Sequence, residues 1–289
     1  MASMRDIKRR KNSIQSTQKI TKAMKLVATA KLQKAKDKAS ETRPYFNKMH
    51  ETIGSILERS NNINHPFLTK REVKNKGYII ITSNRGLAGG YNANVCKLLM
   101  KDAKPDNAKI IAVGKKGADF LKRNGYSIIK EFNDVVEDPL YNDAMIIGEQ
   151  LLAMYKEGVI DELYISYTAF NSTINQEPKL LKVLPVDTEE FDKKDEDGES
   201  EQLSDMMTYE PSPEEVLEQV IPKYINSIIF GALRESVASE HGARMTAMDS
   251  ATNNANDMIE GLSLEYNRAR QASITQELSE IVGGAEALK

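Results

Sequence analysis

The chain has 289 residues, of which 40% are hydrophobic and 28% are charged, a balance that excludes wholesale disorder. No stretch approaches about 18 consecutive apolar residues, which excludes a transmembrane helix, and the first eight residues lack the apolar region of a signal peptide. One cysteine excludes a disulfide framework, and with three histidines no Cys/His metal site is expected.

The N-terminal segment is strongly basic and predicts a long helix over residues 3–58, with Pro44 as its only early breaker. Residues 1–43 hold thirteen Lys or Arg against three Asp or Glu, a net charge of +10, so the rest of the chain carries −12. A stripe of apolar or small residues recurs every seven positions beside a mixed stripe, which predicts a thin coiled-coil seam. The stripes are Ile7, Ile14, Thr21, Ala28 and Ala35, and Met4, Lys11, Gln18, Lys25 and Leu32.

Between residues 76 and 185 short apolar runs alternate with helical patterns. The run 77–82 is apolar and β-branched, as a buried parallel strand should be. This alternation predicts an α/β domain with a mostly parallel sheet. The expected strands are 77–82, 110–114, 126–129, 161–168 and 179–184, and the expected helices are 94–101, 116–123 and 144–156.

An acidic run follows the predicted sheet. Residues 189–201 contain eight Asp or Glu and two Lys around a central glycine. We expect a solvated loop there.

The C-terminal segment, residues 212–286, again predicts helix. Ser212, Pro213 and Glu215 form a helix start signal, Pro222 interrupts the first turns, and no proline follows up to Val282. Neither terminal helix is stable alone in water at this polarity, and both flank the same inserted domain. The two therefore pair as an antiparallel coiled coil.

The expected fold class is α/β: a long antiparallel two-helix coiled coil formed by the N- and C-terminal helices, with an inserted Rossmann-like α/β domain. The shaft comprises residues 1–60 and 210–289, and the α/β domain comprises residues 75–205 with the acidic loop 189–201.

The pairing also predicts a register and an uncovered end. Aligned from the sheet end, Met24 lies level with residues 243–248, and the last ~20 residues extend beyond the pair. The apolar residues of this extension need another protein to cover them, unless the tail folds back. They are Ile274, Leu278, Ile281 and Val282.

A glycine-rich turn at residues 83–92 follows the first predicted strand, where phosphate loops sit. It matches neither of the two common glycine-rich phosphate motifs and has no lysine after its glycines. We expect a tight strand-to-helix turn whose glycines supply positive φ. Its defining residues are Arg85, Gly86, Gly89 and Gly90.

No catalytic constellation emerges from the remaining polar residues. The histidines at 50, 65 and 241 lie far apart in sequence, and no Ser/His/Asp or Cys/His set can be assembled. We expect no catalytic residue, no cofactor and no metal.

Three segments resemble the γ subunit of F-type ATP synthases of the bacterial type. The first is Lys19 to Leu32, and the second is Ile81 to Asn92. The third and most specific runs from Ser239 to Met248, continues with Ala251 to Ala255, and ends with Tyr266 to Leu278. Gly242 departs from the family's usual alanine and Asp249-Ser250 from its usual lysine, without touching the diagnostic residues.

The resemblance implies a central-stalk rotor and not an enzyme. In that family the coiled coil stands inside a hexamer of α and β subunits, and the foot domain binds the ε subunit and rests on the membrane c-ring. Rotation couples ion flow to ATP synthesis or hydrolysis at the β sites, and the subunit regulates ATPase activity and ion flow. The implied location is peripheral, on the cytoplasmic face of the bacterial cell membrane, with no membrane insertion and no nucleic acid.

Matching positions imply the contact residues. Met24, Lys25, Arg244, Arg270 and Gln271 would contact β, and the +10 of the N-terminal arm suits the family's acidic loops on β. The apolar residues of the C-terminal extension would turn in the hexamer's apolar sleeve as a bearing.

Two other classes stay open from the residues alone. One is a basic coiled-coil arm that binds nucleic acid, for which a salt-sensitive RNA shift would be evidence. The other is a nucleotide-dependent enzyme built on the α/β domain, for which ATP hydrolysis by the isolated chain would be evidence.

Overall fold

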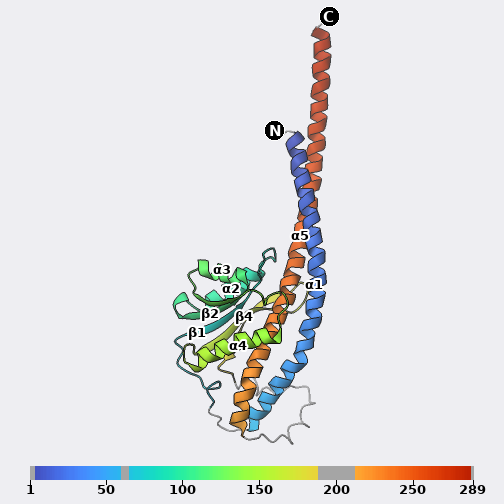
Figure 1. Ribbon diagram of the computed structural model, residues 1–289. Helices are drawn as coiled ribbons and strands as arrows, with labels where there is room; N and C mark the ends of the chain where they lie inside the picture. Colours follow the sequence, from blue (N-terminus) through green and yellow to red (C-terminus); the bar gives the residue numbers. More distant parts are fainter. Residues whose placement is uncertain (1–3, 60–64, 188–211, 288–289) are drawn as a thin grey trace. The chain divides into compact units, whose positions relative to one another are not determined.

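A computed structural model describes residues 4–59, 65–187 and 212–287 (Figure 1). The acidic loop 189–201 lies outside the described residues. The chain divides into two compact units: residues 1–29 with 244–289, here the helical pair, and residues 30–243, here the sheet unit.

The sheet unit contains a five-stranded sheet in the order β3-β2-β1-β4-β5, as Figure 1 shows in part. Strands β1 to β4 pair in parallel, and β5 pairs antiparallel with β4. The elements are β1 (Lys76–Ile81), α2 (Tyr91–Asp102), a 3-10 turn η1 (Pro105–Asn107), β2 (Ala108–Val113), α3 (Lys115–Arg123), β3 (Ile128–Phe132), α4 (Tyr141–Lys156), β4 (Glu162–Phe170) and β5 (Gln176–Leu184).

The expected strands and helices are all present, with ends shifted by up to three residues. The parallel order β3-β2-β1-β4 is that of a Rossmann-like half, as predicted. The antiparallel β5 is joined to β4 by a short hairpin, a connection that parallel strands cannot use.

Both faces of the sheet are buried, which explains why β1 is an uninterrupted apolar run. On one face Tyr78 and Ile80 pack with Val95 and Leu99 of α2. On the other face Ile79 and Ile81 pack with residues of α1, α4 and α5. This second group includes Ile53, Ile56, Ile147, Leu151, Leu217, Ile225 and Leu233.

Two long helices complete the chain: α1 (Met4–Arg59) and α5 (Pro213–Ala287). The predicted start of α5 is confirmed, because the Ser212 Oγ accepts a hydrogen bond from the Glu215 N–H at 3.2 Å and Pro213 is the first helical residue. Pro44 and Pro222 lie inside helices, so the interruption expected at Pro222 does not end α5.

Within the helical pair, α1 and α5 lie side by side and run antiparallel (Figure 1). The predicted seam of α1 is confirmed: Ile7, Thr21 and Ala28 are buried and Ile14 is half-buried. The facing positions of α5 recur at alternating steps of four and three residues, the spacing of a heptad seam. The buried ones are Met248, Thr252, Ala255 and Leu262.

Candidate functional site

Polar contacts join the two helices along the middle of the pair. The buried hydroxyls of Thr21 and Thr252 lie 2.8 Å apart. Each hydroxyl is also close to a carbonyl oxygen of its own helix, at 3.0 Å for Thr21 and 2.7 Å for Thr252. On either side, the Gln18 Nε2 donates to the Asn256 Oδ1 at 2.5 Å, and the Lys25 Nζ donates to the Asp249 Oδ1 at 2.6 Å.

These contacts fix the register of α1 against α5. Because Lys25 faces Asp249, the neighbouring Met24 lies level with residues 249–250. The predicted range of 243–248 is therefore wrong by less than one helical turn. Buried polar pairs are known to specify register in coiled coils, at some cost in stability.

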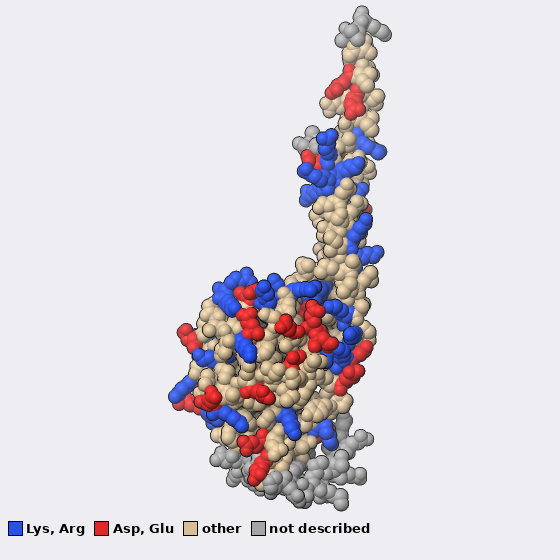
Figure 2. Space-filling view, viewed as in Figure 1, with Lys and Arg blue, Asp and Glu red and all other residues tan. Residues whose placement is uncertain are grey.

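The outer face of α1 is basic with exposed apolar side chains. Ile20, Leu26 and Val27 are 58–64% exposed, and Figure 2 shows Lys and Arg side chains at intervals along the helical pair. Met24 and Lys25 are half-buried at the seam, and the Lys25 ammonium is engaged with Asp249. This mixture of charge and apolar surface suits binding of a protein partner.

The C-terminal end of α5 is uncovered. Ser273 is the last half-buried residue, and every residue from 274 to 285 is exposed. Arg270 and Gln271 are exposed just before it. The four apolar residues predicted to need a partner are 47–68% exposed, so within the described chain nothing covers them: Ile274, Leu278, Ile281 and Val282.

The turn between β1 and α2 is tight, but its positive φ values fall elsewhere than expected. Leu87 has φ 62° and Gly89 has φ 57°, whereas Gly86 and Gly90 do not have positive φ. The expectation that the glycines supply positive φ is right for Gly89 and wrong for the other two. A Cβ on Gly90 would approach the Asn94 Nδ2 to 2.9 Å, a contact that movement of the Asn94 side chain can relieve.

Ser83 forms hydrogen bonds with two other residues of the turn. The Ser83 N–H donates to the Asn92 Oδ1 at 2.9 Å, and the Ser83 Oγ donates to the Arg85 carbonyl oxygen at 2.5 Å. The Arg85 side chain is 83% exposed and lies 3.9 Å from Glu137. These contacts give the turn its shape.

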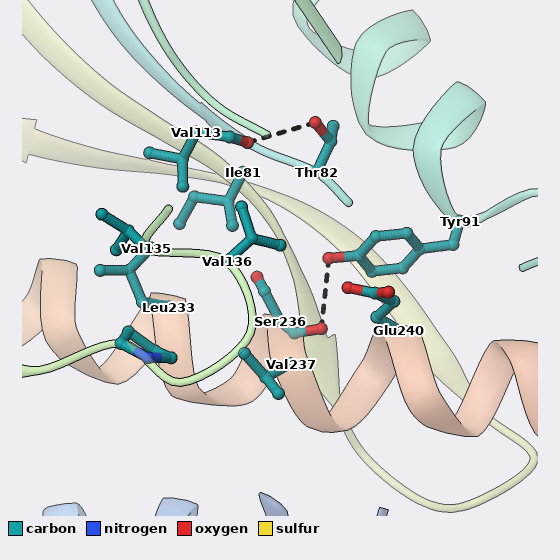
Figure 3. A pocket seen from close by; sticks show the side chains of 11 residues that line it. Ile81, Thr82, Tyr91, Val113, Val135, Val136, Leu233, Ser236, Val237 and Glu240 are labelled. Carbon is teal, nitrogen blue, oxygen red and sulfur yellow. Dashed lines mark hydrogen bonds between the residues drawn. The ribbon is translucent and has the colours of Figure 1, made fainter. Parts of the chain in front are cut away.

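A small cavity lies between the sheet and α5 (Figure 3). The Tyr91 hydroxyl donates to the Ser236 carbonyl oxygen at 3.2 Å at its edge, and Val135, Val136 and Leu233 line it. The space open to the centre of a water molecule is about 10 Å³, room for one water at most. It is too small for a nucleotide.

Other sources of chemistry are sparse across residues 4–59, 65–187 and 212–287. No group of three or more His, Cys, Asp or Glu side chains in these ranges could hold a metal ion. The one cysteine, Cys96, is buried, and burial raises the pKa of its thiol to about 12, which makes it unreactive. No helix in the described part of the chain has the length and apolar content needed to cross a bilayer.

The histidines do not form a site. His65 is buried beside Phe67, and burial lowers the pKa of its imidazole. His50 lies against Phe46 and Tyr224, and His241 is buried in α5.

Comparison with known proteins decides the family. The model of the family described as ATP synthase matches residues 3–288. The ATP synthase gamma chain of Lachnoclostridium phytofermentans is 55% identical over 100% of both chains. The chain belongs to the ATP synthase gamma-chain family.

Further relatives agree with this membership. The gamma chain of Alkaliphilus metalliredigens is 51% identical over 99% of both chains. A gamma chain of Acetobacterium woodii, named as sodium ion specific, is 47% identical over 99% of this chain and 98% of its own. None of these gamma chains is named for nucleic-acid binding, so the nucleic-acid alternative gains no support.

Solved structures share the fold. A chain of the Euglena gracilis mitochondrial ATP synthase (OSCP/F1/c-ring) matches with a TM-score of 0.70 at 22% identity, over 99% of this chain and 94% of that one. A chain of the Tetrahymena thermophila mitochondrial ATP synthase central stalk and c-ring matches with a TM-score of 0.59 at 22% identity, over 80% of this chain and 99% of that one.

Proposed function

We propose that this gamma chain is the central-stalk rotor subunit of an F-type ATP synthase. It couples ion flow through the membrane sector to ATP synthesis or hydrolysis at the β-subunit sites by rotating, and it thereby regulates ATPase activity and ion flow. The observation that carries the proposal is the match of the gamma-chain family along the whole chain, joined to a helical pair whose end is uncovered.

The two parts of the chain divide the work. Residues 1–60 and 210–289 form the shaft that stands in the α/β hexamer. Residues 75–205, with the acidic loop 189–201, form the foot that binds ε and rests on the c-ring. The similar solved chains come from a central stalk with its c-ring and from an OSCP/F1/c-ring assembly, which supports this assignment.

Five residues of the shaft contact the β subunits. Arg270 and Gln271 are exposed at the end of the seam, where they can bind a loop that wraps the helix. Met24 and Arg244 lie at the seam's edge, half-buried, beside the exposed apolar face of α1. Lys25 also joins this contact, and its ion pair with Asp249 orients its ammonium. Cationic side chains here complement an acidic partner loop.

The uncovered apolar end acts as a bearing. Ile274, Leu278, Ile281 and Val282 turn inside an apolar sleeve of the hexamer. Apolar contacts are non-directional, so a rotating helix meets no fixed set of hydrogen bonds to break.

The foot turn has a shaping role. Arg85, Gly86, Gly89 and Gly90 belong to the link from β1 to α2, whose compact form depends on the hydrogen bonds of Ser83 and on the positive φ of Gly89.

The chain is a non-catalytic subunit, located peripherally on the cytoplasmic face of the bacterial cell membrane. The cavity between the sheet and α5 has room for about one water, which supports the non-catalytic assignment.

Affinity purification of a tagged chain from membranes tests the function. We expect α, β and ε subunits to co-purify at fixed ratio, with ATP hydrolysis in the complex and none in the isolated chain. Calorimetric titration of the isolated chain with MgATP should give no saturable heat. A chain that purifies alone from membranes, or a micromolar MgATP site in it, would contradict the proposal.

A further inference from the structure

The loop between β3 and α4, residues 133–140, is held firmly at both ends. The Asn84 Nδ2 donates to the Asn133 carbonyl oxygen at 2.6 Å, and the Leu140 N–H donates to the Asp143 carboxylate at 2.8 Å. Between them Val135 and Val136 are buried against α5, as Figure 3 shows. The next two residues are therefore presented from a rigid support.

One of those residues, Asp138, binds both long helices within the sheet unit. The Lys38 Nζ of α1 donates to its two carboxylate oxygens at 2.6 and 2.7 Å. The Arg234 Nη1 of α5 donates to the first of these oxygens at 2.8 Å. These hydrogen bonds, that from Lys38 foremost, lower the pKa of the Asp138 carboxyl, so it is ionised at neutral pH.

Arg234 is held in place by its surroundings, which restricts the geometry of its contact with Asp138. Its side chain is 12% exposed, and its guanidinium lies 5.0 Å from the centre of the Phe230 ring. A nearly buried cation held over a ring has little freedom to follow a moving partner. Loss of Asp138 would leave this charge without its carboxylate, which is costly for a buried group.

The neighbouring Glu137 provides a contrast. It lies 3.6 Å from Lys31 and 3.9 Å from Arg85, whereas the contacts of Asp138 are 2.6–2.8 Å long, and the two carboxylate side chains are similarly exposed, at 62% and 54%. Distances of 3.6–3.9 Å are longer than a hydrogen bond, so these ion pairs lack the charge-assisted hydrogen bonds of Asp138 and contribute little. The two adjacent carboxylates thus carry the same charge but differ in how tightly they hold the helices.

We propose that Asp138 is a positioning residue for rotation: it ties α1 and α5 to the rigid loop of the foot, so that a twist applied to the foot turns both helices together. This inference rests on the proposed rotor function. The backbone of the foot already connects the two helices. Asp138 adds a direct side-chain link, to Lys38 of α1 and to Arg234 of α5. Removing it leaves the shaft joined but more easily twisted.

Single-molecule rotation of the assembled complex tests this. With the hexamer fixed and a bead on the foot, the angular variance of the bead during a catalytic pause is inversely related to torsional stiffness. Asp138→Asn should raise this variance by about twofold or more, because charge-assisted hydrogen bonds that resist the twist are lost. Glu137→Gln, the matched control, should leave it at the wild-type value.

Two further variants separate positioning from general stability. Asp138→Glu keeps the carboxylate and should recover most of the stiffness. Combining Lys38→Gln with Asp138→Asn should be no worse than Asp138→Asn alone, since both act through one contact.

Equal variance in Asp138→Asn and wild type would overturn the inference, and so would an equal rise in Glu137→Gln. These outcomes are distinct from failure of the proposed function, in which the wild-type complex itself would not assemble or rotate.

Discussion

The helical pair and the sheet unit bury very different side chains. In the sheet unit Ile79, Ile111 and Leu151 are fully buried among other large apolar residues. In the pair the buried positions include Ala28, and a hydroxyl–hydroxyl contact occupies the middle of the seam. Apolar burial is the main source of folding free energy, so the sheet unit is stabilised from within, whereas the pair has little such support.

This difference teaches how a slender element can be built. Small seam residues let two helices approach closely, and polar contacts fix their register where apolar area is scarce. The remaining stabilisation must come from partners that cover the outer face and the end. A rotor shaft needs this combination, because it must be thin, correctly registered and bound on all sides.

The largest expected effect compares matched truncations in the two units. Leu151→Ala in the sheet unit should lower the free energy of unfolding by about 2–5 kcal/mol, since it leaves a cavity in a closed core. Leu262→Ala in the pair should cost about 1 kcal/mol, because water can fill the space beside a two-helix contact. Urea unfolding followed by circular dichroism measures both, and equal losses would contradict the comparison.

The next expected effect is on the ATP turnover of the assembled complex and not on the stability of the chain. Replacing Arg270 and Gln271 by Ala should leave the complex assembled but lower ATP hydrolysis and synthesis together by about tenfold, which corresponds to ~1.4 kcal/mol. A charge-assisted hydrogen bond to an acidic loop on β is sufficient for this. Steady-state turnover of the purified complex is the measurement.

A matched double variant serves as its control. Gln276 and Glu280, which hydrogen-bond to each other at 3.0 Å, are exposed on the same end of α5, and their replacement by Ala should not change turnover. Wild-type turnover in the Arg270/Gln271 variant would remove these two residues from the mechanism.

A smaller effect is expected at the buried hydroxyl pair. Thr252→Val alone deprives Thr21 of its cross-helix partner and should cost about 1 kcal/mol. The double replacement Thr21→Val with Thr252→Val should be closer to neutral, since both polar groups are removed together. Thermal unfolding of the three variants checks this, and a double variant that loses the sum of two single costs would show that the hydroxyls act independently.

The smallest effect is expected at the half-exposed ion pair of Lys25 and Asp249. Asp249→Asn should cost at most about 1 kcal/mol, and this difference from wild type should shrink as salt is raised, because solvent ions screen the pair. Thermal unfolding at low and high salt measures it. A loss that is larger and independent of salt would mean that the pair is shielded from solvent.

Much of this architecture could be predicted from the sequence. The heptad stripe of α1 predicted buried residues of the seam, because its spacing places them on one face of the helix. The uninterrupted apolar run of β1 indicated a strand buried on both faces, because successive side chains of a strand point to opposite faces. The Ser212 cap was readable because its signal is local. The uncovered end of α5 followed from the unequal lengths of the two helices.

Contacts that depend on folding were not predictable in the same way. The register was wrong by part of a turn, since it is set by polar pairs such as Lys25 with Asp249, which no helical period specifies. Leu87 has positive φ as Gly89 does, whereas Gly86 and Gly90 do not, because the hydrogen bonds of the turn shape its backbone. Asp138 was missed altogether: nothing near it in sequence indicates partners about 100 residues away on either side.

The most direct test of the rotor account is rotation itself. The chain is assembled with its α, β and ε subunits, the hexamer is fixed to a surface, and a bead is attached to the exposed foot. On addition of MgATP we predict continuous rotation of the bead in one direction at a rate that follows ATP hydrolysis. Sustained hydrolysis by a complex whose bead stays still would contradict the account.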